Sequence, residues 1–222
     1  KALRAAFNQA RREGLISVNP AEAVELPTRA SVEKEVFTPA QVEILLNAAK
    51  GEWKTMILIG YYTGARLTEC SKVHWDDIDL AGGWITFPAP KQKKAHRTPL
   101  HPGFQQYLES VAGDTNGYLC PKLAGVKTTG RRGLSESFKR IMRQAGIDDD
   151  MVQGSGTRRV SRFSFHSLRH TMNSLMANAG VSQEDRMAAI GHSTAAVNQK
   201  YTHHEGEKLR RAVEVIPSIA LR

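Results

Sequence analysis

The sequence has few cysteines and no long apolar run. Cys70 and Cys120 lie far apart and form no CxxC pair, so neither a disulfide framework nor a zinc ribbon is expected. The longest apolar stretch, MILIGYY at 56–62, has only about a third of the length that a bilayer-spanning helix needs. We therefore expect neither a disulfide-stapled secreted domain nor a membrane-spanning protein. This cysteine usage favours a reducing cytoplasm.

Acidic residues are too few to balance the basic ones. The 222 residues include 31 Lys and Arg against 22 Asp and Glu, which gives a formal net charge of +9. Such an excess favours a polyanionic partner, either nucleic acid or an anionic membrane. Apolar residues make up 41% of the chain, which is enough for the buried core of a globular domain.

The basic residues are concentrated between residues 121 and 170. This segment has eleven Lys or Arg and four Asp or Glu, so it carries +7 (eleven minus four) of the charge. A run of this kind is often no more than a solvated surface. The other interpretation is a surface that binds a polyanion, and charge alone leaves both open.

Helical periodicity dominates the pattern along the chain. The tetrapeptide TPAQ at 38–41 predicts a helix start, with an N-cap threonine, a proline at the first helical position and a capping-box glutamine. GGWITFP and TPL flank a lysine-rich turn and predict a small β-hairpin or meander. Further helical patterns cover 103–111, 134–145, 168–179 and 183–190, each closed by a glycine at or near its end. We expect a mainly α fold with one small antiparallel β-sheet (α+β).

Several basic and aromatic residues lie at helix ends, where they could act on an anion. Arg66, in TGARLTEC, follows a glycine that ends one helix and lies at the start of the next, where anions gather. His166 and Arg169, in FHSLRHT, are three residues apart and share one helix face. GHSTAAVNQKY places Tyr201 nine residues after His192. Each alone also has a structural explanation, such as a surface ion pair for Arg66 or a half-buried ring for Tyr201.

Together with Lys91 in the lysine-rich turn, these residues supply two guanidiniums, an ammonium, two imidazoles and a phenol. That set suits transfer of a phosphodiester without a metal ion. Guanidiniums can neutralise the charge that grows on the non-bridging oxygens. A phenol can be the covalent nucleophile, and a lysine on a turn can protonate the departing 5′ oxygen.

A metal site is not expected. His166 and His170 are four residues apart, but Ser167 stands where the zinc-protease motif has its glutamate. No nearby cysteine or carboxylate pair completes a set of ligands.

Four segments carry a resemblance to a known family. TGARLTE matches its first arginine box and gives Arg66 with a supporting acid, Glu69. PKQKKAHRTPL is similar to its lysine hairpin, HSLRH to its second box, and GH followed by Tyr201 to its third. The chain thus resembles the tyrosine recombinases, the phage integrases and the Xer-like and Cre-like site-specific recombinases, over about residues 35–205. The catalytic residues given by the resemblance are Arg66, Lys91, His166, Arg169, His192 and Tyr201.

The resemblance implies an enzyme that cuts one DNA strand, holds it as a 3′-phosphotyrosine at Tyr201 and passes it to a 5′-hydroxyl of another duplex. In the family, the two arginines and His192 would hold the phosphate. Lys91 would be the general acid, and His166 would assist proton transfer from the tyrosine. The resemblance implies no cofactor.

The implied partners are double-stranded DNA recombination sites, further copies of the chain in a tetrameric synapse, and accessory DNA-bending proteins, with no membrane. The implied location is the bacterial cytoplasm, at the nucleoid during the reaction. Two alternatives stay open: a type IB topoisomerase-like enzyme, which religates the same strand, and a catalytically silent DNA-binding protein, which forms no covalent adduct. A metal-dependent nuclease, which a chelator would inactivate, ranks behind both.

By the same resemblance, residues 1–32 are expected to be the C-terminal remnant of a core-binding domain with its linker, and 33–205 the catalytic domain. Residues 206–222 would form a tail helix that either caps its own chain or docks in trans on a neighbouring protomer. The segment 148–162 is longer than a minimal member needs and is a candidate DNA-contacting insertion. The DNA-binding candidates are Lys93, Lys94, Arg131, Arg132, Arg158, Arg159 and Arg162.

Overall fold

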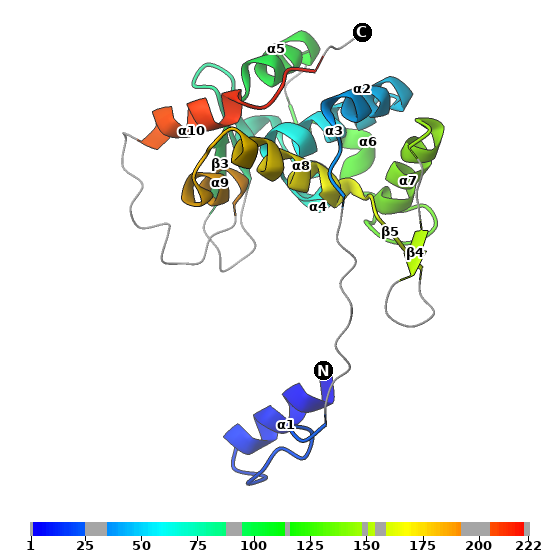
Figure 1. The fold of residues 1–222 in the computed structure, drawn as a ribbon, viewed down its shortest axis with the longest axis vertical. Coiled ribbons are helices and arrows are strands. Elements are labelled where there is room, and N and C mark those ends of the chain that lie inside the picture. The colour runs from blue at the N-terminus through cyan, green and yellow to red at the C-terminus, as the bar shows by residue number, and fades with distance from the viewer. Residues whose placement is uncertain are drawn as a thin grey trace.

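A computed structural model describes residues 2–24, 35–87, 95–113, 116–147, 151–153, 159–191 and 205–219 (Figure 1). In chain order its helices are α1 (Ala2–Arg12), α2 (Pro39–Ala48), α3 (Glu52–Thr63), α4 (Leu67–Cys70), the 3-10 turn η1 (Trp75–Asp77), α5 (Pro102–Val111), α6 (Pro121–Ala124), α7 (Leu134–Gln144), α8 (Phe165–Asn178), α9 (Gln183–Ile190) and α10 (Glu205–Glu214). Its strands are β1 (Ile78–Asp79), β2 (Trp84–Phe87), β3 (His96–Pro99), β4 (Met151–Gln153) and β5 (Arg159–Ser161).

Helix α2 begins at the helix start that the sequence predicted. The side-chain oxygen of Thr38 accepts a hydrogen bond from the backbone N–H of Gln41 at 3.2 Å. The N–H of Thr38 donates to the Gln41 side chain at 2.8 Å. Pro39 occupies the first helical position, where no N–H donor is needed. These contacts form the capping box and fix the start of α2.

The predicted hairpin is part of an antiparallel sheet with the strand order β1-β2-β3. Ile85 pairs with Thr98, and both are buried, whereas Trp84 on the alternate face is half-buried. One face of the sheet therefore packs on the helical core. The expected fold class, mainly α with a small antiparallel sheet, is confirmed.

The prediction of a single sheet was wrong, because β4 and β5 form a second, two-stranded ribbon. Met151 pairs with Ser161 and Gln153 with Arg159 in antiparallel register. Three residues a strand are too few for a period-two pattern to be recognised in the sequence. Helix α8 also begins earlier than its periodicity predicted, at Phe165.

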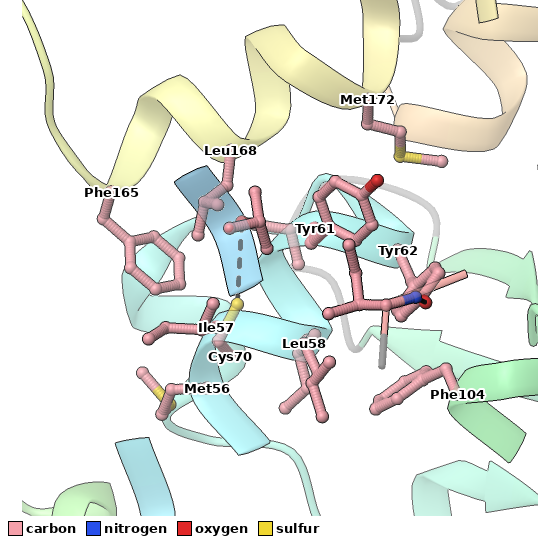
Figure 2. Close-up of a cluster of buried hydrophobic side chains, with 14 of the residues drawn as sticks. Met56, Ile57, Leu58, Tyr61, Tyr62, Cys70, Phe104, Phe165, Leu168 and Met172 are labelled. Atoms are coloured by element: carbon pink, nitrogen blue, oxygen red, sulfur yellow. Dashed lines mark hydrogen bonds between the residues drawn. The ribbon is translucent and has the colours of Figure 1, made fainter. Parts of the chain in front are cut away.

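Helix α3 is the centre of the hydrophobic core. Every residue from Thr55 to Thr63 is buried, and α8 lies across it, as Figure 2 shows for the labelled side chains. The two helices are in close contact at Gly60, where a Cβ atom would stand 2.9 Å from both Leu168 Cδ1 and Phe165 Cζ. Although α3 is strongly apolar, no helix in the described part of the chain is long and apolar enough to cross a membrane.

The tail helix α10 packs against α9 and β3 of its own chain. Leu209, Ala212 and Val213 are buried. After the helix, the backbone N–H of Ile219 donates to the Tyr62 hydroxyl at 3.0 Å. The single chain thus forms the intramolecular cap, and docking of the tail on a neighbouring protomer stays a prediction.

Helix α1 and residues 13–24 form a small unit held by polar contacts. The guanidinium of Arg4 donates to the carbonyl oxygens of Ala21 and Val24 at 2.9 and 2.7 Å. Asn19 is buried and donates to the Arg4 carbonyl at 3.1 Å. No residue of α1 is buried. Its assignment to a core-binding domain stays a prediction.

Replacing Gly60 with alanine tests the close approach of α3 and α8. Alanine is about 1 kcal/mol better than glycine inside a helix, but its Cβ would overlap Leu168 and Phe165, and overpacking of this kind costs about 1–3 kcal/mol. We expect Gly60→Ala to lower the free energy of unfolding, measured by urea denaturation. Gly103→Ala in α5 is the matched control, because its Cβ would meet only ordinary contacts of 3.4 Å or more. Equal stability changes in the two variants would contradict the packing argument.

Candidate active site

The turn between α3 and α4 positions Arg66. Helix α3 ends at Gly64, whose φ of +63° is left-handed and whose N–H donates to the Gly60 carbonyl at 3.1 Å. A Cβ atom on Gly64 would stand 3.2 Å from Ile190 and from Met172, so both its conformation and the lack of space favour glycine. The chain then turns, and Arg66 becomes the exposed N-cap residue of α4.

Glu69, in the first turn of α4, holds Arg66 at two points. Its Oε1 accepts from Arg66 Nη1 at 2.8 Å, and its Oε2 accepts from the Arg66 backbone N–H at 2.7 Å. Burial alone would raise the pKa of the Glu69 carboxyl, but these hydrogen bonds and the charges of Arg66 and Arg169 lower it overall. Glu69 is therefore ionised at neutral pH and orients the Arg66 guanidinium.

Arg169 contributes a buried guanidinium from α8. The residue is only 3% exposed, and its Nη1 donates a hydrogen bond to the Gly64 carbonyl at 2.6 Å. Burial and then the charge of Arg66 lower the pKa of Arg169 to about 10, although Glu69 acts in the opposite direction. The two guanidiniums are thus close enough to repel each other, and Arg169 remains charged at neutral pH. Two such cations beside one carboxylate suit an anion such as a phosphate.

His166 lies in the first turn of α8 and is exposed, three residues before Arg169. Its ring meets that of His170 edge to face, with the centroids 4.8 Å apart. Among the described residues, no group of three or more His, Cys, Asp or Glu side chains could hold a metal ion. The structure therefore brings Arg66, Glu69 and Arg169 together, with His166 on the helix that carries the buried arginine.

Other predicted site residues fall outside the described residues, namely Lys91, Lys93, Lys94, Arg158, His192 and Tyr201. Only the backbone of Arg159 is described, in β5. Arg131 and Arg132 are exposed in the turn before α7. Arg162 pairs with Glu35 at 2.8 Å, which ties the base of β5 to the start of the main domain. The roles assigned to all of these residues stay predictions.

Sequence reasoning missed His96, the first residue of β3. Its Nε2 lies 3.0 Å from the carbonyl oxygen of Ala189, and its ring packs against Gly191 at the end of α9. Burial lowers the pKa of His96 to about 4, the charges of Arg169 and Arg66 act in the same direction, and the Ala189 carbonyl opposes them. The sequence holds no local signal for a partner so far along the chain.

Replacing Glu69 with glutamine tests its charge. Glutamine can still accept the hydrogen bond from the Arg66 N–H, but it carries no charge to offset the two guanidiniums. Because the folded-state pKa of Glu69 is lowered, its stabilising effect is present above the ordinary carboxyl pKa and is lost as the pH falls through the lowered value. We expect Glu69→Gln to lower the free energy of unfolding by about 0.5–1 kcal/mol at neutral pH. In acid, urea denaturation should give equal stabilities for parent and variant.

The control is Glu136→Gln, which removes an exposed pair with Arg143 at 3.0 Å and should change stability very little. A loss for Glu69→Gln that is the same at neutral and acid pH would contradict the electrostatic role.

Comparison with known proteins places this chain in a family. The model of the phage integrase family matches residues 35–208. The tyrosine recombinase XerC of Pediococcus pentosaceus is 25% identical over 222 residues, which cover 95% of this chain and 71% of that protein. The tyrosine recombinase XerD of Pseudomonas putida is 27% identical over 224 residues, which cover 94% of this chain and 70% of that protein.

Solved structures show the same fold. The integrase from mycobacterium phage Brujita superposes with a TM-score of 0.64 at 20% identity, over 100% of this chain and 71% of that one. A lambda integrase (75-356) dimer bound to a COC' core site gives a TM-score of 0.58 at 20% identity, over 90% and 71%. The family model, the named recombinases and the shared fold agree with one another. The chain therefore belongs to the phage integrase family and is a tyrosine-type site-specific recombinase.

Proposed function

We propose that this protein cleaves and rejoins DNA strands through a 3′-phosphotyrosine intermediate at Tyr201, without a metal ion. The arrangement of Arg66, Glu69 and Arg169 carries the proposal. The two guanidiniums lie close together although their charges repel, and one is buried and fixed by a backbone carbonyl. An entering anion relieves this repulsion, and a scissile phosphate is an anion of suitable chemistry.

In the proposed cleavage step, the phenol oxygen of Tyr201 attacks the phosphorus, and the bond from phosphorus to the 5′ oxygen breaks. The imidazole of His166 takes the proton of the phenol, and the departing 5′ oxygen takes a proton from Lys91. Rejoining reverses these transfers with the 5′-hydroxyl of another duplex. The phosphotyrosine bond replaces the phosphodiester bond, so no hydrolysis and no external energy source are needed.

The guanidiniums act on the non-bridging oxygens, together with the imidazole of His192. Negative charge grows on these oxygens as the phosphorus becomes five-coordinate, so donors that are already fixed there stabilise the transition state more than the ground state. Glu69 and the Gly64 carbonyl hold Arg66 and Arg169 in place before substrate arrives. The protein therefore does not have to reorganise these charges during the reaction.

The proposed partner is double-stranded DNA that carries recombination sites. The net charge of +9 and the exposed Arg131 and Arg132 support this choice, and one structural relative is a lambda integrase dimer bound to a DNA core site. We further propose that copies of the chain assemble on DNA as a tetrameric synapse, aided by accessory DNA-bending proteins. Within it, residues 1–32 would belong to a DNA-clamping domain and 206–222 would reach a neighbouring protomer.

Two other activities use the same residues differently. A type IB topoisomerase-like enzyme would rejoin the cleaved strand to its own 5′-hydroxyl, so a labelled acceptor duplex would gain no strand. A catalytically silent protein would bind DNA without any covalent adduct. Membership of the recombinase family favours strand transfer over both.

The nucleophile is tested with Tyr201→Phe on a nicked suicide substrate. The phenyl ring can still pack, but the attacking oxygen is absent, so the variant should bind DNA and form no covalent adduct on a denaturing gel. Parent protein with a chelator is the control and should form the adduct in normal yield. A normal adduct with the phenylalanine variant would assign the nucleophile elsewhere, and loss of the parent adduct with chelator would indicate a required metal.

The general acid is tested by replacing the bridging 5′ oxygen of the scissile phosphate with sulfur. The thiol that leaves has a pKa near that of free cysteine, about 8.5, so it needs no proton on departure. Lys91→Ala should therefore cleave the oxygen substrate very slowly and the sulfur substrate about as fast as the parent. Arg66→Ala should not be rescued, because its charge acts on the non-bridging oxygens. If the sulfur substrate instead rescues Lys93→Ala or Lys94→Ala, that lysine is the general acid.

A further inference from the structure

His96 anchors the strand β3 to the end of helix α9. Its Nε2 lies 3.0 Å from the carbonyl oxygen of Ala189 and 2.6 Å from the Thr98 hydroxyl. The Thr98 hydroxyl donates to the same Ala189 oxygen at 2.9 Å. His96 and Thr98 are two residues apart and so lie on one face of the strand. One backbone carbonyl of α9 thus receives two hydrogen bonds from one face of β3.

This pattern favours one tautomer of the imidazole. A carbonyl oxygen can only accept, so the Nε2 of His96 must carry a hydrogen in order to donate to Ala189. The single hydroxyl hydrogen of Thr98 points to the same carbonyl, so the one hydrogen on Nε2 is shared between the Ala189 carbonyl oxygen and the Thr98 oxygen. Burial, with the charges of Arg169 and Arg66, lowers the pKa of His96 to about 4 although Ala189 and Glu69 oppose this. The ring is therefore neutral at physiological pH, with its hydrogen on Nε2.

The same ring closes against the glycine at the end of α9. A Cβ atom on Gly191 would stand 2.8 Å from Cγ and Cδ2 of His96. Gly191 also has a φ of +73°, which a residue with a side chain adopts only under strain. The contact therefore leaves no room for movement of β3 towards α9, while the hydrogen bonds to Ala189 oppose movement away from it.

Each side of this contact is close in sequence to a predicted catalytic residue. Lys91 precedes β3 in the lysine-rich turn, and His192 directly follows the glycine that His96 contacts. The end of α9 also adjoins the arginine site, because a Cβ atom on Gly64 would stand 3.2 Å from Ile190. A fixed junction of β3 and α9 therefore holds one end of the lysine-bearing turn beside the arginine pair.

We propose that His96 is a positioning residue, which holds β3 on α9 and thereby keeps Lys91 in reach of the departing 5′ oxygen. The inference rests on the proposed function, since that function makes Lys91 the general acid. A lysine on a turn has many conformations, and fixing the strand that follows it reduces the entropy lost when the acid engages its substrate. A neutral imidazole suits this place, because a charged lysine or arginine there would repel Arg66 and Arg169.

The experiment compares His96→Gln with His96→Leu. Glutamine can place a side-chain N–H near the position of Nε2, whereas leucine fills similar space without a donor. Arg97→Gln is the matched control, because Arg97 is the next residue of β3 and faces away, pairing with Asp79 at 3.5 Å. Each protein is assayed for DNA affinity, for the rate of adduct formation on the oxygen and sulfur substrates, and for hydrogen exchange in 95–100 and 186–191.

His96→Leu should form the adduct about 10- to 100-fold more slowly on the oxygen substrate, with unchanged DNA affinity, because a displaced acid lowers the rate and not the binding. On the sulfur substrate its rate should return to within about threefold of the parent, since no acid is needed there. Hydrogen exchange should rise in both segments at once. His96→Gln and Arg97→Gln should resemble the parent in all three measurements.

An equal rate loss of His96→Leu on both substrates would overturn the proposal, and so would parent-like rates or exchange. If His96→Leu does not fold, Thr98→Val tests the same anchor, because it removes the second donor to Ala189 and keeps the shape. A parent protein that forms no adduct would contradict the proposed function. Hydrogen exchange separates failure of the His96 proposal from failure of the proposed function, because it tests the contact between β3 and α9 without any reaction.

Discussion

The hydrogen bond from the buried Arg169 guanidinium to the Gly64 carbonyl is the contact on which the rest of the site depends. It joins α8 to the turn after α3, so it sets the position of one arginine relative to the other. The bond requires a left-handed Gly64 and a close approach of α8 at Gly60, where no side chain fits. Packing of the apolar core, part of which Figure 2 shows, thus determines where two positive charges meet.

The repulsion between these two positive charges also favours the binding of an anion. One carboxylate, Glu69, lies beside two guanidiniums, so a net positive charge remains in a partly buried place. Water screens charges poorly there, and an anion that enters gains more than it would at the surface. Neighbouring elements are held together as well, because His96 ties β3 to α9 and the tail helix α10 packs on both.

Local signals in the sequence predicted much of this fold. The capping box at Thr38 and the helix 183–190 with its closing glycine were correct because they depend on neighbouring residues. The pairing of Arg66 with Glu69 is local too. The contacts of Arg169 with Gly64 and of His96 with Ala189 join residues 105 and 93 positions apart, and no periodicity specifies them. The ribbon β4–β5 was missed because its strands are too short to show a pattern.

The central claim, a covalent bond between DNA and one tyrosine, is tested most directly by locating that bond. The protein trapped on a suicide substrate is digested with trypsin and nuclease, and the modified peptide is sequenced by mass spectrometry. We expect a nucleotide joined through its 3′ phosphate to the side chain of Tyr201. A nucleotide joined through its 5′ phosphate, or attached to any other residue, would contradict it.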